Sequence, residues 1–232
     1  IGRIYHESKK GECIDIKRYF TDGKIDPFET VGPYTERAVT ITDDKGKTVF
    51  HMDDALFPEN WSDNDVKIVA HRYLFKPRKL EWQKKIQEKI GKPYEQSITH
   101  LITRITNFLA DEGEKLGYFK TPADKEVFKD ELKWLQINRK MAFNSPVQFN
   151  AGIYNEYGIA GSAGTQYWHD PQTSEVKIIT EGSWIKPQSH ACFITGPHDN
   201  IESIAEHHKN EAMIFKSGSG VGQGIDRLRG EK

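Results

Sequence analysis

The sequence has 232 residues, of which 36% are hydrophobic, 29% charged and 11% aromatic, the balance of a globular protein and not of a disordered or fibrous one. Its 33 lysines and arginines nearly balance 34 aspartates and glutamates, which argues against nucleic acid or an anionic membrane as the main partner. Apolar runs of three or four residues exclude a membrane-spanning helix, which needs about 20. Two cysteines, Cys13 and Cys192, are too few for a disulfide framework and favour a reducing, cytoplasmic location.

Both ends of the sequence look interrupted. The first residue is Ile1 and not methionine, and the start "IGRIYHESKK" has no apolar signal core. Lys232 follows directly on a glycine-rich stretch, with no closing element after it. We therefore expect a piece of a longer chain.

Residues 1–75 are predicted to be rich in loops, with one β-hairpin. The stretch "AVTITDDKGKTVF" alternates Val39 and Ile41 on one face, turns at residues 43–46 and resumes at Val49. Alternation interrupted by an Asp- and Gly-containing turn is typical of two antiparallel strands.

A helical region is predicted over residues 76–142. It starts with the lysine-rich run "KPRKLEWQKKIQEKIG", in which Glu81 and Glu88 interrupt the positive charge. We interpret this run as a solvated helix face and not as a nucleic-acid-binding helix, because its charges are mixed.

Two amphipathic helices follow in the same region. In "TPADKEVFKDELKWLQINRK", Thr121 is the predicted N-cap and Pro122 occupies the first helical position, where its missing N–H costs nothing. In "SITHLITRITNFLADEGEKLG", closed by Gly117, the apolar residues recur with the helical period. They are Ile98, Leu101, Ile102, Ile105, Phe108 and Leu109.

The next segment is predicted to lack long elements. We expect "FNSPVQFNAGIY" to be extended, because Pro146 disfavours the helical conformation in the residue before it. Residues 155–187 resemble an insertion, with a hairpin in "YWHDPQTSEVKII" that turns at Asp170 and Pro171. His169 has no second ligand at metal-binding spacing, so we expect no metal site.

The stretch "QSHACFITGPHDNIESI", residues 188–204, reads as a strand, a turn and a helix that begins at Asp199. Alternation places His190 and Cys192 on the same face of the strand. From these residues alone, Cys192 also fits a small buried hydrophobe. Asp199 stands three residues before Glu202 and also fits a purely structural capping box.

A glycine-rich loop is predicted in "KSGSGVGQG", after that helix. It matches neither the Walker A nor the Rossmann pattern, and those loops follow a strand and open a helix. Alternating glycines allow the backbone to approach a ribose or phosphate closely, although a flexible linker would have the same composition.

The spaced segments "AFNSPVQFN", "QSHACFIT", "DNIESI" and "FKSGSGVGQGIDRLRGEK" together resemble the first half of the catalytic subunit of ribonucleotide reductases, most closely the adenosylcobalamin-dependent class II branch. The resemblance continues upstream through "FPENWS", "GYF" and "FKDEL" and covers roughly residues 20 to 232. It implies an α/β fold: an N-terminal helical region, then the first strands and helices of a ten-stranded α/β barrel that is incomplete in this chain. The barrel would begin within residues 143–232, which would also contain the effector-binding helix.

The resemblance implies a role for seven residues. Cys192 resembles the cysteine on the first barrel strand that lies under the substrate ribose and supplies reducing electrons as the 2′-hydroxyl leaves as water. Four other residues match positions that meet the substrate, namely Ser145, Ala191, Ser219 and Gly220. Asp199 matches the carboxylate that holds the ribose of a deoxynucleotide effector, and Arg229 matches the arginine that grips the effector phosphates.

The resemblance also implies partners that this sequence does not contain. The family uses adenosylcobalamin, whose binding residues are not assignable here, an external dithiol reductant, and a homodimer with the effector at its interface. Two further cysteines are required, and Cys13 matches neither, so we expect an incomplete enzyme that needs the C-terminal remainder of the reductase. The expected substrates are ribonucleotides, as diphosphates.

Two alternatives remain at this point. The chain could be a non-catalytic fragment that binds nucleotides and dimerises, for which Asp199, Arg229 and the helix between them would suffice. It could also belong to the di-iron, class I branch, which shares the spacing of the cysteine and the effector residues.

Overall fold

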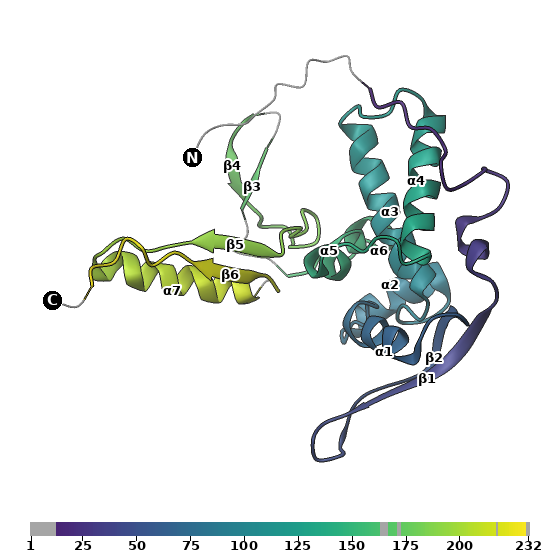
Figure 1. The fold of residues 1–232 in the computed structure, drawn as a ribbon, viewed down its shortest axis with the longest axis horizontal. Helices are drawn as coiled ribbons and strands as arrows, with labels where there is room; N and C mark the ends of the chain where they lie inside the picture. Colours follow the sequence, from purple (N-terminus) through teal and green to yellow (C-terminus); the bar gives the residue numbers. More distant parts are fainter. Residues whose placement is uncertain (1–12, 163–166, 171–172, 217, 231–232) are drawn as a thin grey trace. The chain divides into compact units, whose positions relative to one another are not determined.

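The computed structural model describes residues 13–162, 167–170, 173–216 and 218–230 (Figure 1). The chain divides into two compact units, Ile1–Lys67 with Ser97–Ala142 (unit 1) and Ile68–Gln96 with Phe143–Lys232 (unit 2). The three regions expected from the sequence stay a prediction. In the described part of the chain, no helix is long and apolar enough to cross a membrane.

Unit 1 contains the predicted hairpin and both long amphipathic helices. The hairpin turn is fixed by Asp43, whose Oδ1 accepts the backbone N–H groups of Lys45 and Lys47 at 3.0 and 2.9 Å. Gly46 has the positive φ of 77° that this turn requires. The prediction of the hairpin is therefore confirmed. The elements of unit 1 are η1 (Pro27–Val31), β1 (Tyr34–Thr42), β2 (Thr48–Pro58), the first part of α1 (Asp63–Arg72), α3 (Ile98–Lys115) and α4 (Pro122–Ile137).

Helices α3 and α4 lie side by side in Figure 1, and local sequence signals set their ends. The Thr121 side chain caps α4 and forms a full capping box with Asp124, and Ser97 caps α3. Both helices turn their apolar stripes inward. The buried members are Ile98, Leu101, Ile102, Ile105, Leu132 and Ile137. Both predicted helices are confirmed.

Unit 2 has a separate core where α2 meets α6. Ile86 of α2 is fully buried with Ile153 and Tyr157 of α6, and Phe75 and Trp184 pack against this cluster. The charged face of α2 is exposed, as predicted. The elements of unit 2 are the rest of α1, α2 (Leu80–Ile90), α5 (Ser145–Asn150), α6 (Ile153–Tyr157), β3 (Tyr167–His169), β4 (Val176–Ile178), β5 (Cys192–Thr195), α7 (Ile201–Lys216) and β6 (Gly220–Gln223).

The segment expected to be extended forms the two short helices α5 and α6, so that prediction is wrong. Asn144 adopts the extended conformation outside the helix, with ψ of 159°, and its side chain accepts the N–H of Val147 at 3.2 Å. Pro146 then occupies the first helical turn, where no N–H is needed. The N-cap therefore offsets the restriction that proline places on its neighbour.

The predicted hairpin after Tyr167 is confirmed, since β3 and β4 pair antiparallel with Trp168 opposite Lys177. Of its predicted turn residues, Asp170 accepts a bond from Lys177 Nζ at 2.7 Å, whereas Pro171 lies outside the described residues.

Strand β5, helix α7 and strand β6 form a β–α–β unit with the two strands parallel. The stretch expected to be a glycine-rich loop therefore contributes a strand, which corrects that prediction. The α/β class is confirmed, and among the described residues no closed barrel is formed.

Candidate active site on the open face of β5 and β6

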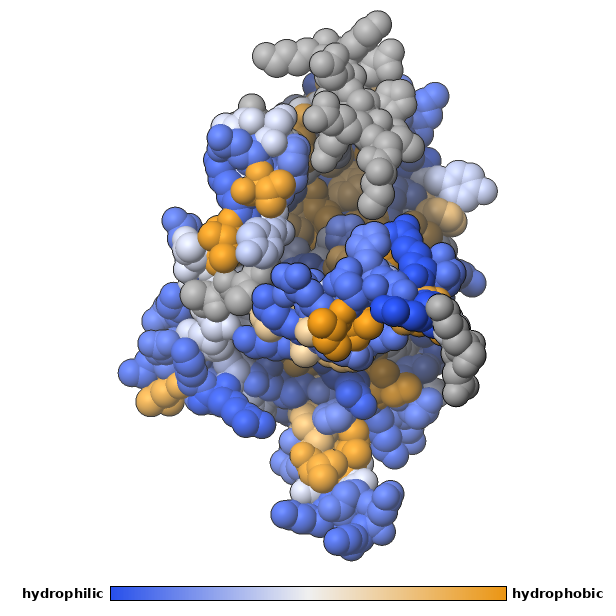
Figure 2. Space-filling view, turned by 90° about the vertical axis from the view of Figure 1, so that its left-hand side faces the viewer, coloured by the Kyte–Doolittle hydropathy of each residue, from blue (hydrophilic) through white to orange (hydrophobic). Residues whose placement is uncertain are grey.

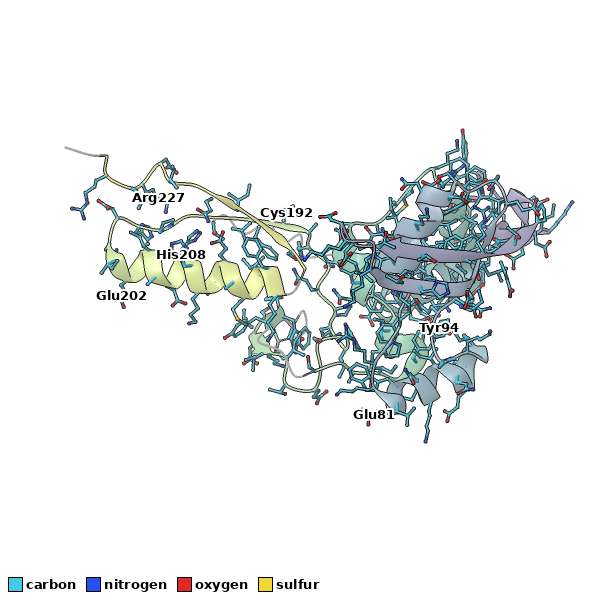
Figure 3. All side chains as sticks on the ribbon, turned by 90° about the horizontal axis from the view of Figure 1, so that it is seen from below. Glu81, Tyr94, Cys192, Glu202, His208 and Arg227 are labelled. Carbon is cyan, nitrogen blue, oxygen red and sulfur yellow. The ribbon has the colours of Figure 1, made fainter. Side chains whose placement is uncertain are left out.

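Cys192 lies on the uncovered face of the β5–β6 pair. It stands opposite Gly220 in the parallel register, and Ile194 stands opposite Gly222. Helix α7 covers the other face, where Thr195 Oγ1 lies 3.3 Å from His207 Nδ1. Figure 3 labels Cys192 on the strand, with α7 running along the strand pair. The structure thus places the thiol on the face that α7 does not cover.

The uncovered face is accessible. Cys192 is exposed and the Ile194 side chain is 90% exposed, so in the described residues this cysteine is not the buried hydrophobe that it could have been. Figure 2 shows apolar residues as small patches in a mainly hydrophilic surface.

The glycines of β6 leave space beside the thiol. A Cβ on Gly220 would meet only the carbonyl oxygen of Ala191, at 3.8 Å, and one on Gly222 would meet Ile194 Cγ1 at 3.8 Å. No side chain from β6 therefore stands opposite Cys192, and the bare backbone lets a flat ligand approach closely. Sequence reasoning identified these glycines but not their pairing with the cysteine strand.

Ser219 is held where β6 begins. Its hydroxyl donates to His190 O at 2.6 Å and accepts the Gln188 side-chain amide at 3.4 Å, and its side chain is buried. The Gly220 N–H donates to Ala191 O at 2.7 Å. Because its hydrogen is used within the protein, the Ser219 hydroxyl could meet a ligand only as an acceptor.

Ser145 is the first residue of α5, and its Oγ lies 3.1 Å from the Tyr73 hydroxyl. The neighbouring Asn144 donates its side-chain N–H to Ser189 O at 3.0 Å. The start of α5 is therefore bonded to the segment that leads into the Cys192 strand.

The two predicted effector residues form an ion pair. Arg229 Nε lies 2.9 Å from Oδ2 and 3.1 Å from Oδ1 of Asp199, with the arginine side chain 75% exposed. Figure 3 places the segment after β6, marked by Arg227, near the end of α7 that carries Glu202. The pair joins the loop before α7 to the segment after β6.

Asp199 does not cap α7. The Asn200 side chain accepts the Ser203 N–H at 2.8 Å, and the helix begins at Ile201 rather than at Asp199. The sequence-based capping box between Asp199 and Glu202 is therefore wrong, since the neighbouring Asn200 takes that role. Asp199 is left to bind Arg229.

A hollow of about 500 Å³ lies beside the first half of α7. Its lining includes Asn200, Glu202, Glu206 and His207. Two carboxylates make it unsuited to phosphate, so phosphates bound near this end of α7 would depend on a cation such as Arg229.

Comparisons with known proteins identify the family of the chain. Residues 35–139 match the family described as class II vitamin B12-dependent ribonucleotide reductase, and residues 190–232 match the barrel domain of ribonucleotide reductase. The chain belongs to the class II ribonucleotide reductases. This family identity replaces the di-iron alternative.

Curated relatives match along nearly the whole chain. The vitamin B12-dependent ribonucleotide reductase of Rhodopirellula baltica is 34% identical over 231 residues, which cover 100% of this chain and 21% of the relative. That of Streptomyces coelicolor is 32% identical over 227 residues, covering 97% of this chain and 19% of the relative. The chain thus spans about a fifth of the length of these class II reductases and corresponds to their N-terminal region.

The family depends on vitamin B12. The described residues include no group of three His, Cys, Asp or Glu residues that could hold a metal ion. Nothing in these residues fits a corrin ring in particular.

Proposed function

We propose that this chain supplies the first barrel strand and one reducing thiol of an adenosylcobalamin-dependent reductase that converts ribonucleoside diphosphates to 2′-deoxyribonucleotides. The single observation that carries the proposal is the accessible Cys192 opposite Gly220 on the open face of β5 and β6. A thiol beside bare backbone suits a reaction in which a ribose must lie within bonding distance of sulfur.

The proposed reaction balances with two thiols. Cys192 and a second cysteine, outside these 232 residues, provide two electrons and two protons. The C2′–O bond breaks, water leaves, a C2′–H bond forms, and the two sulfurs form a disulfide. A third cysteine, also outside this chain, takes hydrogen from C3′ as a thiyl radical and returns it. An external dithiol then reduces the disulfide.

The other residues of the open face would bind the ribonucleotide. Gly220 and Ala191 contribute backbone, Ser219 contributes an acceptor oxygen, and the Ser145 hydroxyl at the start of α5 would complete the contact with substrate. Amides and hydroxyls suit a ribose, which offers both donors and acceptors.

We further propose that Asp199 and Arg229 bind a deoxynucleotide effector at a homodimer interface. The ion pair supports this, because a ribose hydroxyl can replace the guanidinium at Asp199 while phosphates bind Arg229 by charge-assisted bonds. The same ion pair favours a second candidate function, a module that binds nucleotides but does not reduce them, since Asp199 and Arg229 are both present in this chain.

One complementation assay separates the two functions. The chain is incubated with a ribonucleoside diphosphate, adenosylcobalamin and a dithiol, with and without the separately expressed remainder of the catalytic chain. We expect no deoxynucleotide from this chain alone and turnover from the mixture. Turnover by the chain alone would contradict the proposal, and an assembled but inactive mixture that still binds deoxynucleotide would favour the binding module.

A further inference from the structure

Three side-chain amides donate hydrogen bonds to the segment that leads into the Cys192 strand. They belong to Asn144, Asn150 and Gln188, and none of them was singled out from the sequence. All three lie in unit 2 and donate to backbone carbonyls of residues 188–190.

Helix α5 contacts this segment from both of its ends. At the N-cap, Asn144 Nδ2 donates to Ser189 O at 3.0 Å. At the last residue, Asn150 Nδ2 makes a longer contact of 3.5 Å with Gln188 O, while its Oδ1 accepts the Trp184 indole N–H at 3.1 Å. Two consecutive carbonyls are thus bonded to the N-cap and to the last residue of the same helix.

The third amide ties the same segment to β6. Gln188 Nε2 donates to His190 O at 3.0 Å and lies 3.4 Å from Ser219 Oγ, which itself donates to His190 O. A continuous set of bonds therefore runs from the start of α5, beside Ser145, to the point where β6 aligns Gly220 with Cys192.

We propose that Asn144 is a positioning residue, which sets the Cys192 strand relative to Ser145 and Gly220 by holding Ser189. The proposal rests on the proposed function for its catalytic consequence, but the structural step can be measured without it. An amide suits the role because it donates and accepts at once without bringing a charge next to a substrate site. Asn144 uses both halves, Oδ1 for the α5 cap and Nδ2 for Ser189.

Because the two bonds of Asn144 use different atoms, a substitution can remove one bond and keep the other. Asn144→Asp keeps the capping oxygen, since aspartate is as good an N-cap as asparagine, but removes the donor to Ser189. Asn138→Asp is the matched control: its Nδ2 donates to Trp134 O and Thr30 Oγ1, both at 3.1 Å, within unit 1. Both variants make the same chemical change and lose the same kind of bond.

The first readout is amide hydrogen exchange in this chain. In Asn144→Asp we expect Val147 to keep its protection and the Gly220 amide, which donates to Ala191 O, to exchange severalfold faster. Asn138→Asp should leave Gly220 unchanged. Unchanged exchange at Gly220 in a folded Asn144→Asp chain would overturn the inference, whether or not the chain takes part in nucleotide reduction.

The second readout is kinetic, in the assembled reductase. Loss of positioning should lower kcat by roughly 10- to 100-fold with the melting temperature preserved, because a misplacement of about 1 Å is costly to a reaction that needs close approach. Wild-type kcat in Asn144→Asp would overturn the inference and leave the proposed function standing. An inactive wild-type assembly would instead count against the proposed function. In that case, hydrogen exchange at Gly220 would still decide whether Asn144 positions the Cys192 strand.

Discussion

Arg229 Nε lies 2.9 Å from Oδ2 of Asp199, while the neighbouring Asn200 caps α7. The ion pair and the helix cap, which a single aspartate could have served, are thus divided between adjacent residues. The division makes the two roles separable by mutation.

We predict that Asn200→Ala affects the stability of the chain, whereas Asp199→Ala affects the response of the assembled enzyme to deoxynucleotides. Asn200→Ala removes the cap and should lower the free energy of unfolding by about 1 kcal/mol. Asp199→Ala removes an exposed ion pair, whose contribution to stability is small in water, but should blunt the change in substrate preference caused by deoxynucleotides. Urea unfolding and a mixed-substrate assay of the assembled enzyme measure the two effects.

The response of Asp199→Ala to deoxynucleotides decides whether Asp199 binds an effector. If Asp199→Ala leaves the response to deoxynucleotides intact, Asp199 and Arg229 merely join two surface segments. Glu202→Ala, at a residue without a cap role in α7, is the control for removing a carboxylate from this end of the helix.

Local signals were sufficient to predict α3 and α4 from the sequence. The apolar stripe from Ile98 to Ile105, and the cap and proline at Thr121 and Pro122, act within a few residues, and both helices form where those signals lie. The hairpin turn at Asp43 is equally local.

Predictions failed where a distant or competing partner decides the conformation. The glycine run became β6 because it pairs with β5, and nothing near Gly220 in the sequence indicates that partner. Pro146 suggested extended chain, but the Asn144 cap outweighed it. The candidate site shows the same limit: Cys192 could be singled out, whereas the amides that hold its strand could not.

The bare backbone opposite Cys192 gives a second prediction. Gly220→Ala should fold normally, because the new Cβ would lie 3.8 Å from its nearest neighbour and Gly220 does not have a positive φ. Removing a glycine should raise stability slightly by restricting the unfolded chain. In the assembled reductase, the added methyl group should nevertheless raise KM by occupying the space beside the thiol.

Gly196→Ala is the contrasting variant for this prediction. Its Cβ would lie 2.4 Å from Gly224 O, so the backbone must shift and unfolding should become easier. If Gly220→Ala keeps a wild-type KM, ligands do not approach Cys192 along β6.

Lys76 gives a pH-dependent prediction. Burial lowers the pKa of its ammonium to about 8, although Glu95 opposes the shift and Leu74 O accepts a hydrogen bond from Lys76 Nζ at 3.0 Å. Between pH 8 and the ordinary lysine pKa of about 10.4, the unfolded state binds more protons than the folded state. The free energy of unfolding should therefore rise with pH through this window.

Comparing Lys76→Met with wild type isolates that effect. The stability of wild type relative to Lys76→Met should increase from pH 8 to pH 10, as measured by urea unfolding. The same comparison with the exposed Lys84→Met should give no such trend. A flat difference for Lys76 would mean that the carbonyls around it hold the charged form as well as water does.

The role of Cys192 is tested most directly by counting thiols over one turnover. The assembled enzyme, without added reductant, is mixed with a ribonucleoside diphosphate and adenosylcobalamin, and deoxynucleotide yield is measured beside free thiols. Wild type should lose two thiols for each product, whereas a folded Cys192→Ser enzyme that still binds effector should make none; Cys13→Ser is the matched control and should behave as wild type. Normal deoxynucleotide yield from the folded Cys192→Ser enzyme would contradict the central claim that this thiol is a reductant.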